Sequence, residues 1–295
     1  MLLAQRALRD AVKEQVQKLA DGDGKAKEAA QEWLDTFDCG SSNGAATEKL
    51  IAACEQCGSD AAKYILKNKD FAAKKSQWTF GGDGWGYDIG FGGLDHVIAS
   101  GRDINIMLFD TEVYSNTGGQ ASKSTPTGAV AQFAASGKTV KKKDLASIAM
   151  SYGYVYVAQI ALGADYNQAV KAICEAEAYP GPSLVIAYAP CINHGIKKGM
   201  DKAMTEEELA VKSGYWHLFR YNPTLREEGK AAFTLDSKTP TEDYQQFLLG
   251  EVRYNSLKMA NPALADELYA KSESEAKERY EYLNKLVTLY GATEK

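Results

Sequence analysis

The sequence has few of the residues on which several common kinds of site depend. Only three histidines occur among its 295 residues, His96, His194 and His217. No two of them have the spacing that places two metal ligands on one face of a helix, which argues against a zinc hydrolase. The serines after Gly40 lie in a polar Gly-Ser-Ser-Asn stretch and not in the Gly-x-Ser-x-Gly turn of serine hydrolases.

Long apolar runs and an excess of basic residues are also lacking. No run approaches the roughly 20 apolar residues that a membrane span needs, so we expect no membrane association. The net charge is −5 and the pI is near 5.4, which gives no basic surface for nucleic acid. The N-terminus has no apolar core of a secretory signal, and we therefore expect a cytoplasmic protein.

Cysteine is present but sparse. In a reducing cytoplasm, disulfides are not expected. Leu50, Cys54 and Cys57 recur at i, i+4 and i+7, which predicts one buried face of a helix over residues 47–57 and favours thiols that pack in a core over metal ligands. The five cysteines are Cys39, Cys54, Cys57, Cys174 and Cys191.

The pattern of apolar residues predicts an α/β fold with a doubly wound, mostly parallel sheet and helical N- and C-terminal extensions. Four apolar runs read as buried strands and alternate with helical patterns, as in βαβ units. The expected strands are residues 78–80, 104–109, 154–160 and 184–189, and the expected helices between and after them are 87–100, 143–152 and 165–178.

The segments on either side of this core are expected to be mainly helical. The expected parts are a helical lead-in over residues 1–75, an α/β core over 76–200 and a C-terminal extension over 201–295. The expected helices of the lead-in are 2–19, 25–37, 47–57 and 60–67; those of the extension are 205–213, 243–259 and 262–290, with a strand-like stretch at 215–221. The last helix is charged throughout, so we expect it to lie across the surface of a larger assembly.

Two polar, glycine-rich turns each follow a strand-like run. The first is residues 81–88 (Gly-Gly-Asp-Gly-Trp-Gly-Tyr-Asp), and the second is residues 110–119 (Asp-Thr-Glu-Val-Tyr-Ser-Asn-Thr-Gly-Gly). Mg²⁺ bound to a diphosphate needs few protein oxygens. Asp83 can supply one, and the Thr111 hydroxyl, a carbonyl near Val113 or the Asn116 amide can supply neutral ones. This spacing is typical of thiamine diphosphate enzymes.

Other nucleotide-binding motifs fail on these residues. A Gly-x-Gly-x-x-Gly fingerprint would need its third glycine at Tyr87 or Ile89, depending on the register. A P-loop ending in Gly137-Lys138-Thr139 would need its first glycine at Gln132. Spacing alone leaves open a thiamine diphosphate site, an unspecified phosphate site or a structural turn.

Six longer strings carry a more specific resemblance. They are residues 80–95, 110–120, 152–157, 180–194, 214–223 and 247–254. In these strings the chain resembles the C-terminal, thiamine diphosphate-binding portion of pyruvate:ferredoxin (flavodoxin) oxidoreductase, and the similarity covers nearly the whole sequence.

The resemblance implies a set of site residues. The first turn would line the diphosphate, with Asp83 binding Mg²⁺. The second would close the other side, with the Thr111 hydroxyl and the Val113 carbonyl completing the protein ligands of the metal. Cys191 would be the last of four thiolates that hold a [4Fe–4S] cluster. The residues implied to contact these cofactors are Gly82, Asp83, Gly84, Trp85, Thr111, Glu112, Val113, Tyr114, Ser115, Asn116 and Cys191.

The resemblance also implies an activity and partners. The complete enzyme would oxidatively decarboxylate pyruvate to acetyl-CoA and pass electrons through iron–sulfur clusters to ferredoxin or flavodoxin. It would be a homodimer in which upstream domains supply the remaining cofactor and substrate contacts. We therefore expect this chain to be incomplete and inactive alone. The alternatives are half of a non-oxidative thiamine diphosphate enzyme, or a non-catalytic fragment that folds only with the missing domains.

Overall fold

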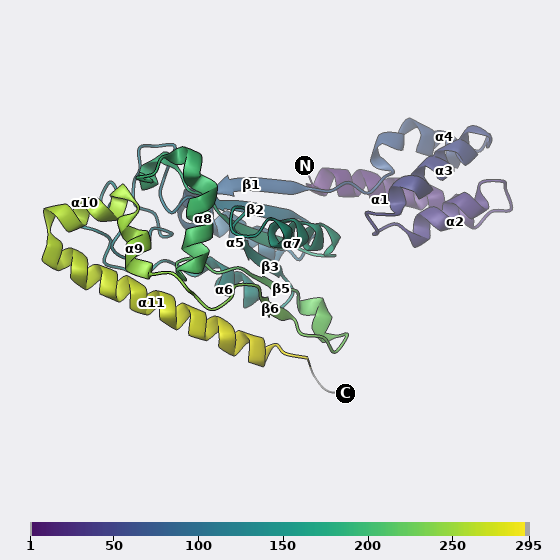
Figure 1. Cartoon of the computed structure of the whole chain (residues 1–295). Helices are drawn as coiled ribbons and strands as arrows, with labels where there is room; N and C mark the ends of the chain where they lie inside the picture. The colour runs from purple at the N-terminus through teal and green to yellow at the C-terminus, as the bar shows by residue number, and fades with distance from the viewer. Residues whose placement is uncertain (1, 293–295) are drawn as a thin grey trace. The chain divides into compact units, whose positions relative to one another are not determined.

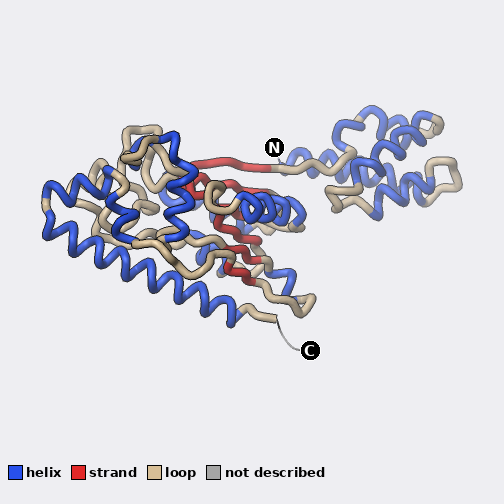
Figure 2. The backbone as a smooth tube through the Cα atoms, viewed as in Figure 1, coloured by secondary structure: helices blue, strands red, loops and turns tan. Residues whose placement is uncertain are grey.

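A computed structural model describes residues 2–292 of the chain. The chain divides into two compact units, Met1–Gln77 and Trp78–Lys295. Figure 1 traces the chain from one end to the other, and Figure 2 distinguishes its helices from its strands. In the described part of the chain, no helix is both long and apolar enough to cross a membrane.

The first unit is entirely helical, as its sequence predicts. Its core contains Trp33, Leu50 and Cys54, all fully buried. Burial raises the pKa of the Cys54 thiol to about 11, which suits a core residue and disfavours a metal-binding thiolate. Cys57 lies beyond the end of its helix and is only partly buried. The helices are α1 (Leu2–Ala20), α2 (Lys27–Asp35), α3 (Asn43–Glu55) and α4 (Asp60–Lys67).

The second unit is built on a six-stranded sheet, and the expected fold class is confirmed. The strand order is β1-β2-β4-β3-β5-β6. The first four strands are parallel, and β5 and β6 continue the sheet with antiparallel pairings. The strands are β1 (Trp78–Gly82), β2 (Asn105–Asp110), β3 (Tyr156–Ile160), β4 (Ser183–Tyr188), β5 (Phe219–Tyr221) and β6 (Phe233–Leu235).

Helices cover both faces of the sheet because successive strand residues point to opposite sides. In β4, Leu184 and Ile186 join the core that includes α5 (Phe91–Ala99) and α6 (Leu145–Met150). Val185 between them packs instead with α7 (Tyr166–Ala178). This alternation is the doubly wound arrangement that the sequence predicts.

The C-terminal helices pack into the same unit as the sheet. The sequence predicts that the last helix lies across the surface of a larger assembly, but one face of α11 contributes Leu268, Tyr269 and Leu286 to the sheet unit's own core. This helix is the long yellow ribbon in Figure 1. The strand β6 was not expected, because three residues carry too short a pattern. The helices are α8 (Ala203–Lys212), α9 (Tyr244–Leu249), α10 (Val252–Ala260) and α11 (Pro262–Leu289).

The register of β1 and β2 determines where the two glycine-rich turns meet. These strands are parallel neighbours, with Gly82 opposite Phe109 at their carboxyl ends. Asp83 follows β1 directly, and Thr111 follows β2 directly. The chain therefore brings both turns to one edge of the sheet, where ligands bind in open α/β folds.

Candidate metal and diphosphate site

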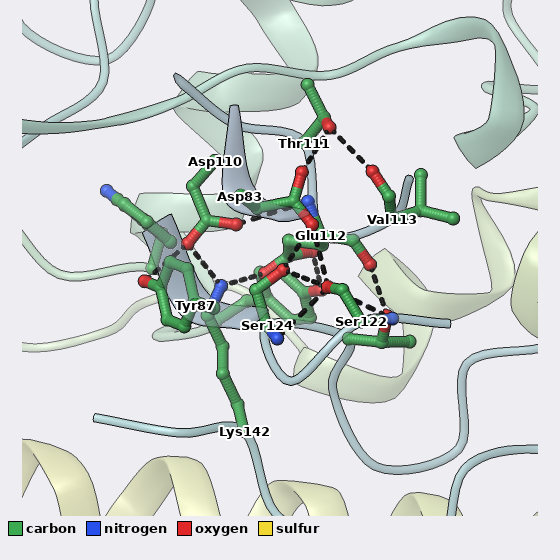
Figure 3. Close-up of polar contacts among 12 residues, drawn as sticks. Asp83, Tyr87, Asp110, Thr111, Glu112, Val113, Ser122, Ser124 and Lys142 are labelled. Carbon is green, nitrogen blue, oxygen red and sulfur yellow. Dashed lines mark hydrogen bonds and ion pairs between the residues drawn. The ribbon is translucent and has the colours of Figure 1, made fainter. Parts of the chain in front are cut away.

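Asp83 is the centre of a cluster of hydroxyl groups at this edge. Asp83 is only 2% exposed. One carboxylate oxygen, Oδ1, lies 2.8 Å from Thr111 Oγ1. The other, Oδ2, accepts hydrogen bonds from Ser122 Oγ at 2.7 Å and Ser124 Oγ at 2.8 Å (Figure 3). The structure thus brings together the two turns and a third segment that the sequence analysis did not include.

Three oxygens of this cluster have the spacing of metal ligands. Thr111 Oγ1 lies 2.8 Å from Asp83 Oδ1 and 3.0 Å from the Val113 carbonyl oxygen. Adjacent ligands of an octahedral Mg²⁺, each about 2.1 Å from the metal, are about 3 Å apart. The one hydroxyl proton of Thr111 can be donated to only one of the other two oxygens at a time. A bound cation could contact all three oxygens together. The residues therefore fit Mg²⁺.

Glycine lets the two turns approach each other closely at Gly84. A Cβ added to Gly84 would lie 2.3 Å from a carbon of the Tyr114 ring, so any other residue here would force the ring to move. A π-helical turn, Gly84–Ile89, begins directly after Asp83, so its first backbone amides lie close to the end of β1. Free amides at the start of a helical turn suit an anion such as a phosphate.

The other residues implied to contact the diphosphate surround this edge to different degrees. Gly82 and Asn116 are exposed, while Trp85, Tyr114 and Ser115 are partly buried. Ser115 Oγ lies 3.4 Å from Thr111 Oγ1, so it adjoins the three oxygens.

Ser122 and Ser124 were missed from sequence because they belong to a long irregular segment after β2. Both hydroxyls are buried, and they lie 2.6 Å from each other. The only signal is the run Ser-Lys-Ser-Thr at residues 122–125, which has no helix or strand periodicity. Their contact with Asp83 spans about 40 residues and comes only from the fold.

A buried ionic network lies behind the second turn. Lys142 Nζ is 2.8 Å from both an Asp110 oxygen and Glu112 Oε1. Glu112 Oε2 accepts from Arg253 Nη2 at 2.8 Å and from the Tyr215 hydroxyl at 2.5 Å. Figure 3 shows Lys142 between the two carboxylates.

The pKa values of Asp110 and Glu112, the two acids that contact Lys142, shift in opposite directions. Burial raises the pKa of Asp110 to about 6, because the desolvation of its charge outweighs the attraction of Lys142. Burial also opposes ionisation of Glu112, but Lys142 and Arg253 outweigh it and lower its pKa to about 2. Glu112 is therefore a charged anchor within the protein interior.

The backbone of Glu112 has a conformation that side chains rarely adopt. Its φ is +57°, in the left-handed region. Such a conformation costs on the order of 1–2 kcal/mol for a residue other than glycine. The resemblance implies that Glu112 contacts the cofactor, whereas in the structure both of its carboxylate oxygens are bound by buried cations of the protein interior.

Cys191 lies at the start of a short loop beside the second turn. It is partly buried, and its sulfur accepts a hydrogen bond from the Asn193 backbone N–H at 3.3 Å. Three residues later, His194 is fully buried and its Nε2 donates to the Thr111 carbonyl at 2.8 Å. This hydrogen bond joins the loop of Cys191 to the metal-ligand turn.

The surroundings of Cys191 offer no complete cluster site. Within residues 2–292, no group of three or more histidine, cysteine, aspartate or glutamate side chains gathers as a metal site. A pocket of about 310 Å³ lies beside the second turn, and its lining includes Val113, Gly119, Arg253 and, from the loop after Cys191, Asn193. The three oxygens of Asp83, Thr111 and Val113 are not such a group, because only one of them belongs to a carboxylate.

Comparison with known proteins places the chain in a family. Residues 60–187 match the family described as "Thiamine pyrophosphate enzyme, C-terminal TPP binding domain". The chain is 55% identical over 261 residues to a pyruvate-flavodoxin oxidoreductase of Klebsiella pneumoniae. It is 60% identical over 222 residues to a pyruvate:ferredoxin oxidoreductase of Moorella thermoacetica. The chain belongs to the pyruvate:ferredoxin (flavodoxin) oxidoreductase family and represents its thiamine diphosphate-binding portion.

The match covers most of this chain and a minor part of its relatives. The two alignments cover 88% and 75% of the chain but 22% and 19% of these members of the family. Among solved structures, a 2-oxoglutarate:ferredoxin oxidoreductase from Magnetococcus marinus matches 41% of each chain at 25% identity. Its TM-score of 0.37 is too low to support a structural comparison.

Proposed function

We propose that this chain holds the Mg²⁺ and the diphosphate of thiamine diphosphate in a pyruvate:ferredoxin (flavodoxin) oxidoreductase. One observation carries the proposal: Thr111 Oγ1 lies 2.8 Å from Asp83 Oδ1 and 3.0 Å from the Val113 carbonyl oxygen. One charged and two neutral ligands suit a metal whose remaining ligands are phosphate oxygens and water.

In this proposal the two turns divide the work of binding. Asp83, Thr111 and Val113 hold the metal. Residues 82–85 of the first turn approach the diphosphate with their backbone amides, and Ser115 and Asn116 close the site from the other side. Ser122 and Ser124 orient the Asp83 carboxylate through its second oxygen.

The reaction is that of the complete enzyme. Thiamine diphosphate, when bound, supplies a carbon nucleophile and an electron sink for the decarboxylation of a 2-oxo acid. This chain's residues bind and orient it. We assign the pyruvate and coenzyme A contacts to the remainder of a homodimeric cytoplasmic enzyme, since the chain spans about a fifth of its relatives.

Within the chain we propose three parts, with the helical lead-in over residues 1–75, the cofactor-binding core over 76–200 and the extension over 201–295. The core carries both turns and Cys191. The extension contributes Arg253, which contacts the second turn from behind.

Cys191 is proposed as one ligand of a [4Fe–4S] cluster that receives electrons near the thiamine. A backbone N–H directed at its sulfur suits a cluster thiolate, because such hydrogen bonds tune the reduction potential. Three further thiolates would come from other parts of the enzyme. Electrons would then pass to ferredoxin or flavodoxin.

Calorimetric titration of the chain with thiamine diphosphate, with and without Mg²⁺, tests the proposal. We expect binding that depends on Mg²⁺ and is lost in Asp83→Ala. Binding of equal affinity without metal, or in the variant, would contradict the metal assignment. No binding by a chain that melts cooperatively would mean that the two turns alone do not form the site.

A further inference from the structure

The second turn has a backbone shape that its own sequence does not favour. Glu112 lies between the two proposed neutral metal ligands, Thr111 and Val113, and has a φ of +57°. Its side chain contacts the buried cations Lys142 and Arg253. On either side of it, the Thr111 hydroxyl contacts both Asp83 Oδ1 and the Val113 carbonyl. Whatever holds Glu112 therefore also holds the geometry of the proposed metal site.

Two cations hold the Glu112 carboxylate, and they differ in what else they contact. Lys142 is shared with Asp110, which belongs to the end of β2. Arg253 reaches Glu112 from a part of the chain 141 residues away and donates to its Oε2 at 2.8 Å. Both the Arg253 and Glu112 side chains are almost completely buried.

Arg253 is itself fixed on several sides. Its Nε donates to Glu251 Oε2 at 2.6 Å, and its Nη2 lies 2.9 Å from the Tyr215 hydroxyl. Its backbone carbonyl accepts from the Val130 N–H at 2.9 Å. A planar guanidinium with several donors can hold two carboxylates in fixed relative positions, which a lysine ammonium does less well.

The segment that carries Arg253 also contacts the loop of Cys191. The Val252 N–H donates to the Gly195 carbonyl at 2.8 Å, and the Lys197 N–H donates to the Gly250 carbonyl at 3.0 Å. The start of α10 and the residues just before it therefore contact both Glu112 of the second turn and the loop that begins at Cys191.

From these contacts we propose that Arg253 is a positioning residue for the Mg²⁺ site, acting through Glu112. The inference rests on the proposed function. Arg253 contacts none of the three proposed ligand oxygens; it fixes the carboxylate of the residue between two of them. Loss of this support is expected to weaken Mg²⁺ binding before it affects contacts of the first turn with the diphosphate.

The test is a Mg²⁺ titration of the 295-residue chain at a fixed concentration of thiamine diphosphate, in which binding is measured by calorimetry. In Arg253→Met we expect the Mg²⁺ concentration at half-saturation to rise on the order of tenfold, as for other groups that orient metal ligands. At saturating Mg²⁺, the affinity for thiamine diphosphate should return toward that of the unsubstituted chain.

Arg220→Met is the matched control. Arg220 is an arginine of β5 in the same unit, paired with Glu175 and Asp236 at 2.6 and 2.8 Å. Its replacement should lower the melting temperature but leave the Mg²⁺ dependence unchanged. If Arg253→Met does not fold, Arg253→Lys retains the charge and should still raise the Mg²⁺ requirement.

The outcomes separate this inference from the proposed function. A folded Arg253 variant with an unchanged Mg²⁺ dependence would overturn the positioning role alone. Absence of Mg²⁺-dependent binding in the unsubstituted chain would overturn the proposed site, and the positioning role with it. An equal loss of Mg²⁺ affinity in the Arg220 control would also overturn the positioning role, because the loss would then reflect lower stability of the whole unit.

Discussion

Replacement of Asp83 by Asn is expected to have opposite effects on stability without and with the cofactor. Asp83 is 2% exposed, and the hydrogen-bond partners of its carboxylate in the site are the hydroxyls of Thr111, Ser122 and Ser124. Hydroxyl donors compensate a buried charge less well than a cation does. Removal of the charge with retention of the shape should therefore leave the metal-free chain equally stable or more stable.

The cofactor should reverse this order. A ligand present at 100 times its Kd adds about 2.7 kcal/mol to the free energy of unfolding. In a unit of the size of Trp78–Lys295, each kcal/mol shifts the melting temperature by about 2–4 °C. Mg²⁺ with thiamine diphosphate should thus raise the melting temperature of the unsubstituted chain by about 5–10 °C. The Asp83→Asn variant lacks the charged ligand, so it should show little or no rise.

Thermal unfolding with thiamine diphosphate, in the presence of Mg²⁺ or of a chelator, measures both effects. Asp236→Asn is the control, since it weakens an ion pair with Arg220 in the same unit and should preserve the cofactor-induced rise. An Asp83→Asn variant that keeps the full rise with Mg²⁺ would refute Asp83 as a metal ligand. A large loss of stability without metal would refute the claim that its charge is poorly compensated.

Three further predictions concern other residues. Ser124→Ala removes one hydroxyl that orients the buried carboxylate and should raise the Mg²⁺ requirement on the order of tenfold in the same titration. Cys191→Ser in the complete enzyme should leave Mg²⁺-dependent thiamine diphosphate binding unchanged but remove one cluster's electron paramagnetic resonance signal. An unchanged signal would contradict Cys191 as a cluster ligand, and the absence of any cluster signal from the unsubstituted enzyme would favour a non-oxidative enzyme. Burial, aided by Arg279, lowers the pKa of His217 to about 3 from 6.5, and Tyr280 stacks on its ring. Between these two pH values the unfolded chain binds a proton at His217 that the folded chain does not, so the free energy of unfolding falls as the pH drops. His217→Phe should remove about 2 kcal/mol of the decrease in this free energy between pH 7.5 and pH 5. Urea unfolding at the two pH values measures it.

The regular elements of the fold were predictable because their signals are local. Four buried strands and the helices between them follow from apolar runs of a few residues and from periodicity along one helix. The strand β6 and the inward face of α11 were not, because both depend on contacts with distant parts of the unit. A charged helix with a few apolar positions shows its buried face only when the partner surface is known.

The candidate site divides in the same way. Asp83, Thr111 and Val113 belong to two turns whose residue types and spacing already suggest diphosphate and Mg²⁺. The contacts that support them from behind leave no local pattern. Arg253 lies 141 residues from Glu112, and an arginine in a helical stretch is ordinarily a surface residue. Only the fold shows that this one is buried against a carboxylate.

The charges around the second turn suggest why the site should depend on a metal. Two cations behind the second turn, Lys142 and Arg253, are already engaged with the buried carboxylates of Asp110, Glu112 and Glu251. Their positive charge stabilises the turn and is largely neutralised there, so little of it remains to attract a diphosphate. The Asp83 carboxylate would repel that anion unless a divalent cation lay between them. Mg²⁺ is therefore expected to be the group that makes binding favourable at this edge of the sheet, and comparable affinity in the presence of a chelator would contradict this view of the site.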